Sequence, residues 1–146
     1  MSTTALVAEP SETFRASLEA IFAAAGWQVI GRSALDDARK DVAERAPGVV
    51  VTSLKLGGFN GIHLVYLAKL ANPLAVCVVY GEADRAEEAQ RAGAIYVEHS
   101  CIREALPDIL DSMFRRAAEA SKYLLPFPVG RLASSDDSFP VKRPEK

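Results

Sequence analysis

Short apolar runs alternate along the chain with longer segments in which apolar residues recur at helical spacing. The apolar runs are rich in β-branched residues and of strand length, which is typical of β-strands. They are TALVAE (4–9), WQVIG (27–31), VVVTS (49–53), LAVCVVY (74–80) and IYVE (95–98). Because most of them are continuously apolar rather than alternating, they predict strands covered on both faces in a parallel sheet.

The segments between and after these runs predict five helices. The first has one apolar stripe at i, i+4, i+7, i+8 and i+11, made by Phe14, Leu18, Ile21, Phe22 and Ala25. Gly26 follows it as a C′ glycine would, and Ser33 is the expected N-cap of the second helix. The third helix is expected to end at Asn72-Pro73, and the fourth, which is rich in alanine, at Gly93.

Five strands alternating with five helices predict an α/β fold of (βα)5 type, with a doubly wound, five-stranded parallel sheet as in flavodoxin-like folds. In such sheets, ligands gather at the carboxyl ends of the strands. We therefore expect the functional residues at Glu9, at Ser53, between Val78 and Tyr80, and at His99.

Composition narrows the functional classes. The chain has 146 residues, 49% of them hydrophobic and 25% charged, with a net charge of −2, so it carries no overall basic field for nucleic acid. Its longest apolar runs fall well short of the ~20 residues that cross a membrane, and the N-terminus lacks the pattern of a secretory signal. We expect a cytoplasmic protein with no nucleic-acid or membrane partner. Its two cysteines predict no metal site, and we expect no cofactor.

The end of the chain differs in composition from the rest. Residues 126–146 hold four of the eight prolines and several serines, without apolar periodicity. We predict a single domain over residues 1–121, followed by a Pro/Ser-rich tail at 122–146. The alternative is an ordered arm that docks on its own domain or on a neighbour.

Four segments in order resemble the receiver domain of two-component response regulators. They are LVAEPSETFR after the first strand, PGVVVTSLKLGGFNG at the third, VVYGEAD at the fourth and AGAIYVEHS at the fifth. The resemblance covers roughly residues 4–118. It implies the same fold and a role in phosphorelay signalling.

The resemblance also implies where phosphorylation chemistry would lie. In that family, an aspartate at the end of the third strand accepts the phosphoryl group, and an acidic pair after the first strand helps it to hold magnesium. Here Ser53 takes the acceptor position, while Glu9 and Pro10 take the positions of the acidic pair. Only the carboxylate of Glu9 remains, with no acceptor aspartate beside it to help bind magnesium. We therefore expect no metal and no aspartyl-phosphate chemistry.

The remaining positions of the family's site are also changed. The hydroxyl residue that ends the fourth strand is matched by Val78, or by Val79 if the register slips. The lysine that ends the fifth strand is matched by His99, with Ser100 as the alternative after one deletion. Tyr96 matches the aromatic residue that moves during activation, and we expect it to stay in one rotamer because Val78 supplies no hydroxyl.

Receivers commonly dimerise or meet partners through the fourth helix, fifth strand and fifth helix. In this chain the fourth helix offers Arg85, Glu88 and Arg91 for such an interface, although any solvated helix can carry similar charges. The resemblance thus implies a protein partner, such as a sensor kinase or another signalling protein, or a second copy of the chain.

The leading prediction is a degenerate member of the family, a pseudo-receiver. It would be a signalling or adaptor domain, not an enzyme, that acts by protein–protein contact without phosphorylation. The alternative is a sensor of a small molecule or anion, bound by the loop GGFNG and the hydroxyls of Thr52 and Ser53. A lesser alternative is that Ser53 is an unconventional phosphoacceptor, which would require an adjacent base.

Overall fold

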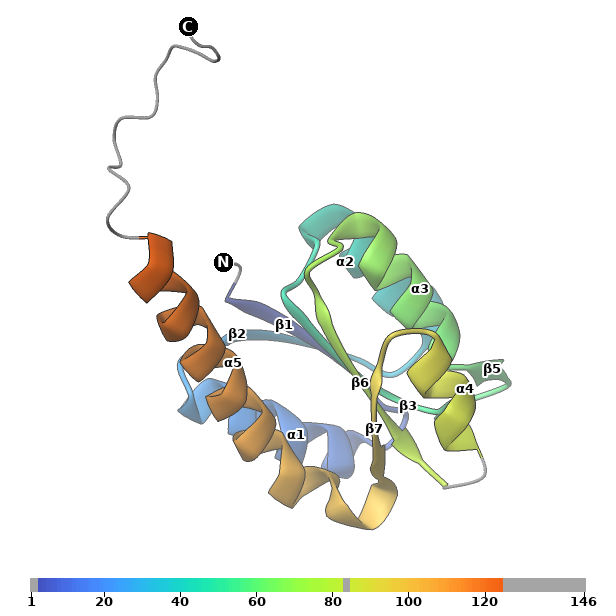
Figure 1. Cartoon of the computed structure of the whole chain (residues 1–146). Helices are drawn as coiled ribbons and strands as arrows, with labels where there is room; N and C mark the ends of the chain where they lie inside the picture. Colours follow the sequence, from blue (N-terminus) through green and yellow to red (C-terminus); the bar gives the residue numbers. More distant parts are fainter. Residues whose placement is uncertain (1–2, 83–84, 125–146) are drawn as a thin grey trace, which may run out of the picture. The chain divides into compact units, whose positions relative to one another are not determined.

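The computed structural model describes residues 3–82 and 85–124 (Figure 1). One parallel sheet has the strand order β2-β1-β3-β6-β7. Its strands are β1 (Thr4–Ala8), β2 (Gln28–Arg32), β3 (Val49–Ser53), β6 (Val76–Gly81) and β7 (Ile95–Glu98). The predicted five-stranded (βα)5 sheet is therefore confirmed, and each strand lies within two residues of its predicted bounds at either end.

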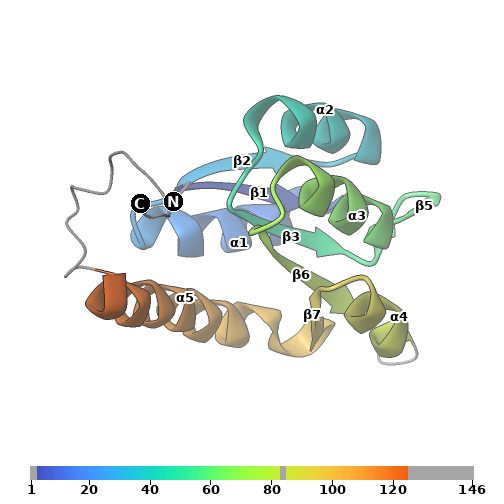
Figure 2. The ribbon, with the colours of Figure 1, turned by 45° about the horizontal axis from the view of Figure 1, so that its top comes forward.

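The helices lie on both faces of the sheet. They are α1 (Glu12–Ala24), α2 (Leu35–Arg45), α3 (Ile62–Ala71), α4 (Ala86–Arg91) and α5 (Ile102–Leu124). Helix α1 covers one face, and α2 and α3 cover the other (Figure 2). The loop after each strand's carboxyl end therefore lies at one edge of the sheet, where a site is expected.

The helix ends follow the predicted signals with one exception. The Ser11 side chain caps α1 by accepting a hydrogen bond from the Phe14 N–H at 3.3 Å, and Gly26 follows the helix with φ of +88°. The N-cap of α2 is Ala34, so the prediction of Ser33 is wrong by one residue. Helix α2 begins one residue later, at the buried Leu35, and no side chain caps it.

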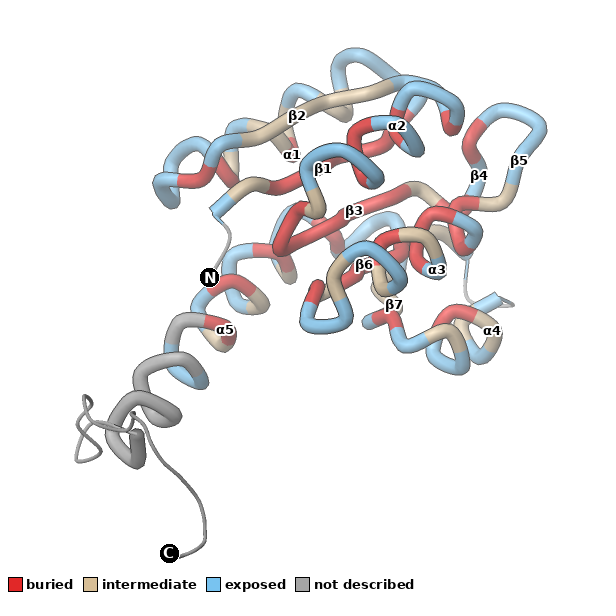
Figure 3. Tube along the Cα trace, turned by 90° about the horizontal axis from the view of Figure 1, so that it is seen from above, coloured by how far each residue is buried: buried red, intermediate tan, exposed pale blue. Residues whose placement is uncertain are grey.

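The core is divided by the alternation of side chains along the strands. On one face of the sheet, residues of the three central strands pack against α2 and α3. The strand residues include Leu6, Ala8, Val50 and Val79, and the helix residues include Val42, Leu64 and Val65. The buried centre of β1, β3 and β6 is visible along the chain trace (Figure 3). Residues at the odd positions of β1 and β3, such as Val7 and Val51, face the α1 side instead.

A small antiparallel hairpin after β3 was not among the predicted elements. It pairs β4 (Lys55–Leu56) with β5 (Phe59–Asn60), and Gly57 at its turn has φ of +62°. A Cβ atom on Gly61 would lie 2.1 Å from the backbone oxygen of Ser53, so this position accepts no side chain without a backbone shift. The loop GGFNG is therefore folded back tightly onto the end of β3.

An ion pair joins α2 to the edge strand. The Asp41 carboxylate is buried, and the Arg32 Nε donates to it at 2.5 Å. This hydrogen bond raises the pKa of Arg32 above its ordinary value. The guanidinium of Arg45 lies 3.9 Å from the other carboxylate oxygen.

The chain divides into two compact units, Met1–Pro107 and Asp108–Lys146. Helix α5 continues to Leu124, past the domain end predicted at residue 121. The rest of the predicted tail, including any docked arm, lies outside the described residues. Among the helices of residues 3–82 and 85–124, none combines the length and apolar character needed to cross a membrane.

Candidate functional site

The register of the central strands decides which residues meet at the edge of the sheet. Ser53 pairs with Tyr80 across β3 and β6, whereas Val78 pairs with Val51. Tyr80 is thus the β6 residue level with the predicted acceptor position, and Val78 lies two residues earlier and fully buried. Val79 faces the opposite side, in the core. Neither valine is level with Ser53, because β6 continues beyond both.

Glu9 lies directly after β1 and is held by neighbouring donors. The Tyr80 hydroxyl donates a hydrogen bond to Glu9 Oε1, and the Ser11 N–H donates to Oε2 at 2.8 Å. The Arg15 guanidinium donates to the Glu9 backbone oxygen at 2.8 Å. Glu9 is 7% exposed and Tyr80 is 0% exposed. Both oxygens of this carboxylate are therefore engaged inside the protein.

The ionisation of Tyr80 is suppressed in this environment. Burial raises the pKa of Tyr80 well above its ordinary value, and the hydrogen bond to Glu9 and the negative charge of Glu9 raise it further. The phenol therefore stays protonated at any physiological pH. It acts as a permanent neutral donor to the carboxylate.

Three rings pack together beside this hydrogen bond. His99 stacks on Phe14 with ring centroids 4.6 Å apart and an interplanar angle of 16°. Tyr80 lies 5.7 Å from both rings, tilted by 54° to Phe14 and 52° to His99. The guanidinium carbon of Arg103 lies 5.7 Å from the Phe14 centroid, within the range of a cation–π contact. His99, the predicted lysine equivalent, is thus part of an aromatic cluster.

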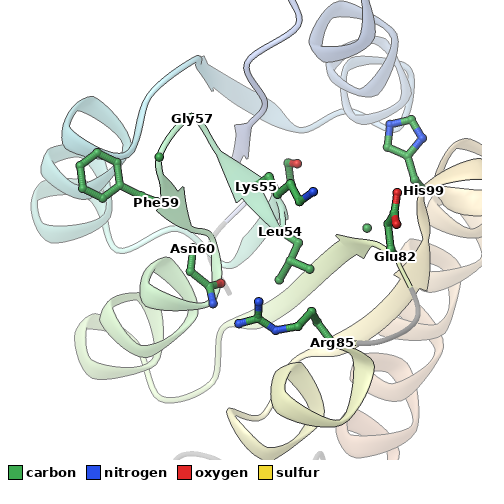
Figure 4. A pocket seen from close by; sticks show the side chains of 11 residues that line it. Leu54, Lys55, Gly57, Phe59, Asn60, Glu82, Arg85 and His99 are labelled. Atoms are coloured by element: carbon green, nitrogen blue, oxygen red, sulfur yellow. The ribbon is translucent and has the colours of Figure 1, made fainter.

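A pocket of about 480 Å³ lies between the β4–β5 hairpin, the end of β6 and the beginning of α4 (Figure 4). Among its described lining residues, the cations Lys55 and Arg85 and the ring of His99 accompany one carboxylate, Glu82. Ser53 also lines the pocket. This is the open part of the strand-end region, and it is separate from the buried contact of Tyr80 with Glu9.

The prediction that both hydroxyls of the third strand face one site is wrong for Thr52. Thr52 is fully buried, and its hydroxyl donates to the Ser53 backbone oxygen at 3.0 Å. Consecutive strand residues point to opposite faces, so only Ser53 reaches the pocket. Pro10 is exposed and offers no side-chain ligand. In the part of the chain that the structure describes, no three His, Cys, Asp or Glu side chains are arranged to hold a metal ion.

The other predicted positions lie away from the buried carboxylate. Tyr96 packs, partly buried, against the core on the α2/α3 face, opposite to Tyr80. On α4, Arg85 pairs with Glu88 at 2.6 Å, and Arg91 lies 3.7 Å from Glu87. The charges of this helix are thus paired along its own surface. Ser100, the alternative to His99, is exposed in the short 3-10 helix His99–Cys101.

One residue that shapes the site was not singled out for it from the sequence, and a second was indicated without a role. Phe14 belongs to the predicted apolar stripe of α1, which indicates a buried position but not a ring stack. Tyr80 ends the segment from Val78 to Tyr80 in which functional residues were expected, but the hydroxyl position was assigned to Val78 or Val79 and Tyr80 received no role. Its partner depends on the register between β3 and β6, which the run itself does not encode.

No protein-family model and no curated protein sequence matches the chain. Solved structures do. The receiver domain dimer of NtrC4, activated by beryllofluoride, is 26% identical with a TM-score of 0.60, over 66% of this chain and 84% of that one. A Burkholderia pseudomallei response regulator is 24% identical with a TM-score of 0.66, over 86% of this chain and 75% of that one. A receiver domain from Clostridium thermocellum is 18% identical with a TM-score of 0.70, over 82% of this chain and 99% of that one.

This chain has the receiver fold. The alternation of five strands with five helices that the sequence predicts is present in the structure. The likeness to the NtrC4 receiver domain, at 26% identity, indicates a role in two-component signalling. The receiver fold here carries Glu9 after β1 and Ser53 at the end of β3. Tyr80 on β6 lies level with Ser53 on its other side and donates a hydrogen bond to Glu9.

Proposed function

We propose that this chain is a pseudo-receiver, a signalling or adaptor domain that works by protein–protein contact without phosphorylation and is not an enzyme. The observation that carries the proposal is the state of Glu9. Its two carboxylate oxygens accept hydrogen bonds from Tyr80 and from the Ser11 backbone, and the facing end of β3 holds Ser53. The site is built for internal hydrogen bonding.

The chemistry of phosphoryl transfer supports this proposal by contrast. Transfer to a carboxylate needs that nucleophile, a divalent cation to offset phosphate charge, and a cationic clamp. The Burkholderia neighbour has a phosphorylated aspartic acid and a calcium ion. In this chain Ser53 replaces such a nucleophile, Pro10 offers no ligand, and His99 is stacked on Phe14. A serine hydroxyl is also a poor nucleophile without an adjacent base.

Incubation with acetyl phosphate and Mg²⁺, followed by intact-mass spectrometry, tests the proposal. We expect no added phosphoryl group, and we expect amide NMR spectra that beryllofluoride leaves unchanged. A conventional receiver treated in parallel provides the positive control, and Ser53→Ala provides the matched variant. A phosphoryl adduct that Ser53→Ala abolishes would refute the proposal and establish Ser53 as an unconventional acceptor.

The proposed contact surface includes α4 and β7. Ile95 on the edge strand β7 is 40% exposed. The charged side chains of α4 form ion pairs with one another along the surface of that helix. The NtrC4 neighbour is a receiver domain dimer. We propose a partner protein or a second copy on this surface. Sedimentation velocity of the wild-type protein and of Ile95→Asp tests whether the partner is a second copy. If it is, the wild type sediments as a dimer and the variant dimerises more weakly.

A second candidate function is binding of a small anion in the pocket of about 480 Å³. Lys55 and Arg85 favour it, because they place two cations around a pocket that Ser53 also lines. In thermal-shift assays, inorganic phosphate or a member of a nucleotide panel should raise the melting temperature of the wild-type protein. The rise would shrink in Lys55→Gln and persist in Lys40→Gln, an exposed control on α2. Unchanged melting curves across the panel would reject this candidate.

A further inference from the structure

We propose that Tyr80 closes the strand-end site to divalent cations by donating a hydrogen bond to Glu9 Oε1 and occupying the space beside that oxygen. This inference rests on the proposed function and deepens it, because it names the residue that makes the site unable to respond. Loss of the acidic residues is then only half of the change. A bulky donor has been built in where a cation would sit.

The first step is position. Glu9 directly follows β1, whose last residue Ala8 pairs with Thr52, so Glu9 is at the level of Ser53. Tyr80 is the partner of Ser53 on the other side. The carboxylate, the acceptor position and the phenol therefore share one level of the sheet, on the α1 face. A cation bound between β1 and β3 would have to lie at this level.

The second step is competition for the oxygen atoms. A cation binds carboxylate oxygens through their lone pairs, and each hydrogen-bond donor takes up one of the two lone pairs of its oxygen. Glu9 Oε2 accepts from the Ser11 N–H at 2.8 Å, and Oε1 accepts from the Tyr80 hydroxyl. A cation that approached Oε1 from the side of β6 would meet the Tyr80 hydroxyl, so the phenol would have to give up its acceptor or move.

The third step is that the phenol has little freedom to move. Tyr80 is fully buried, and its ring packs against the rings of Phe14 and His99 at 5.7 Å from each. Phe14 is partly exposed and His99 is exposed, but the fully buried Tyr80 ring cannot rotate far in a close-packed interior without displacing its neighbours. The ring stack therefore holds the hydroxyl against Glu9.

This arrangement has a testable consequence. Restoring acidic residues by Pro10→Asp and Ser53→Asp should not create a magnesium site while Tyr80 remains. Replacing Tyr80 by threonine in the same chain removes the ring and leaves a small hydroxyl. We expect Mg²⁺, titrated into the millimolar range and followed by calorimetry and amide NMR, to bind the triple variant at least about tenfold more tightly than the double variant.

Two further variants keep the test decisive. Pro10→Asp/Ser53→Asp/Tyr66→Thr changes an exposed tyrosine of α3 and should bind Mg²⁺ no better than the double variant. Pro10→Asp/Ser53→Asp/Tyr80→Phe keeps the ring and removes only the hydroxyl, and it should bind more tightly than the double variant even if the threonine variant does not fold. Circular dichroism establishes folding for each protein.

The inference is overturned if the double variant binds Mg²⁺ as tightly as the variants that lack the Tyr80 hydroxyl. It is equally overturned if the folded variants without that hydroxyl show no gain in affinity. Both results concern redesigned chains. A wild-type chain that responds to acetyl phosphate or beryllofluoride would instead refute the proposed function, so the two failures are distinct.

Discussion

Tyr80→Phe is the smallest change that tests how this site is held together. It deletes one hydroxyl and leaves Glu9 Oε1 without its donor in a residue that is only 7% exposed. Hydrogen bonds to charged groups contribute roughly 1.5–3 kcal/mol, and a buried acceptor that loses its partner keeps its desolvation penalty. We therefore expect the free energy of unfolding to fall by about 2 kcal/mol at neutral pH.

Urea denaturation, followed by circular dichroism and by the fluorescence of the buried Trp27, measures this change. The denaturant dependence should stay the same, since the variant alters no large surface. Tyr66→Phe is the matched control, because Tyr66 is 56% exposed. Its effect should stay within about 0.5 kcal/mol.

A double-mutant cycle assigns the loss to the Glu9 contact. Glu9→Gln removes the charge, so it should be less destabilising in the Tyr80→Phe background than in wild type. We expect a coupling energy of at least about 1 kcal/mol. Additive effects, or a Tyr80→Phe protein as stable as Tyr66→Phe, would refute the reasoning that the phenol stabilises a buried carboxylate.

Three other predictions concern the frame around the site. Gly61→Ala should lower the free energy of unfolding by more than about 2 kcal/mol in urea, since its Cβ meets backbone at 2.1 Å, whereas Gly58→Ala, which meets nothing within 4 Å, should be nearly neutral. Burial raises the pKa of the Cys77 thiol from 9.0 to about 11, so the folded chain keeps a proton that the unfolded chain loses. Stability should therefore fall by about 2–3 kcal/mol more in wild type than in Cys77→Ala as the pH rises through this range. Arg32→Met removes the closest partner of the buried Asp41 carboxylate on α2 and should lower the free energy of unfolding in urea by about 1–3 kcal/mol. Arg39→Met, which breaks an exposed pair, should lower it by less than about 0.5 kcal/mol.

The sheet and its helices could be predicted because they rest on local patterns. Continuous β-branched runs mark strands buried on both faces, and the run VVVTS coincides with β3 from Val49 to Ser53. Glycines with positive φ end α1 and α4 where the sequence places them, at Gly26 and Gly93. The β4–β5 hairpin escaped prediction because each strand has two residues, too few to show a period. The N-cap of α2 is Ala34 and not the predicted Ser33, and no side chain caps this helix, so the capping signal alone did not locate its first residue.

The site could be predicted only in part, since it depends on register. The positions of Glu9 and Ser53 follow from where β1 and β3 end, and both are found at the sheet edge. Which β6 residue lies beside Ser53 does not follow from the sequence, because the link after α3 sets how far β6 extends along β3. That register, in which Val49 pairs with Val76, places Tyr80 beside Ser53 and leaves Val78 deeper. A one-dimensional comparison of strand ends cannot supply this offset.

The changes at this site are physically linked. A cluster of several carboxylates repels itself, and it needs a cation to keep all of them ionised in a partly buried place. With Pro10 and Ser53 in the other positions, a single negative charge remains on Glu9, and two hydrogen-bond donors suffice to satisfy it. A neutral phenol is well suited to the task because its raised pKa keeps it a donor at every pH at which the protein operates. Under the proposed function, the strand edge needs no cation, because hydrogen bonds from Tyr80 and Ser11 satisfy the carboxylate of Glu9. A fold maintained in this way is available for protein contacts regardless of phosphorylation, as the proposed function requires.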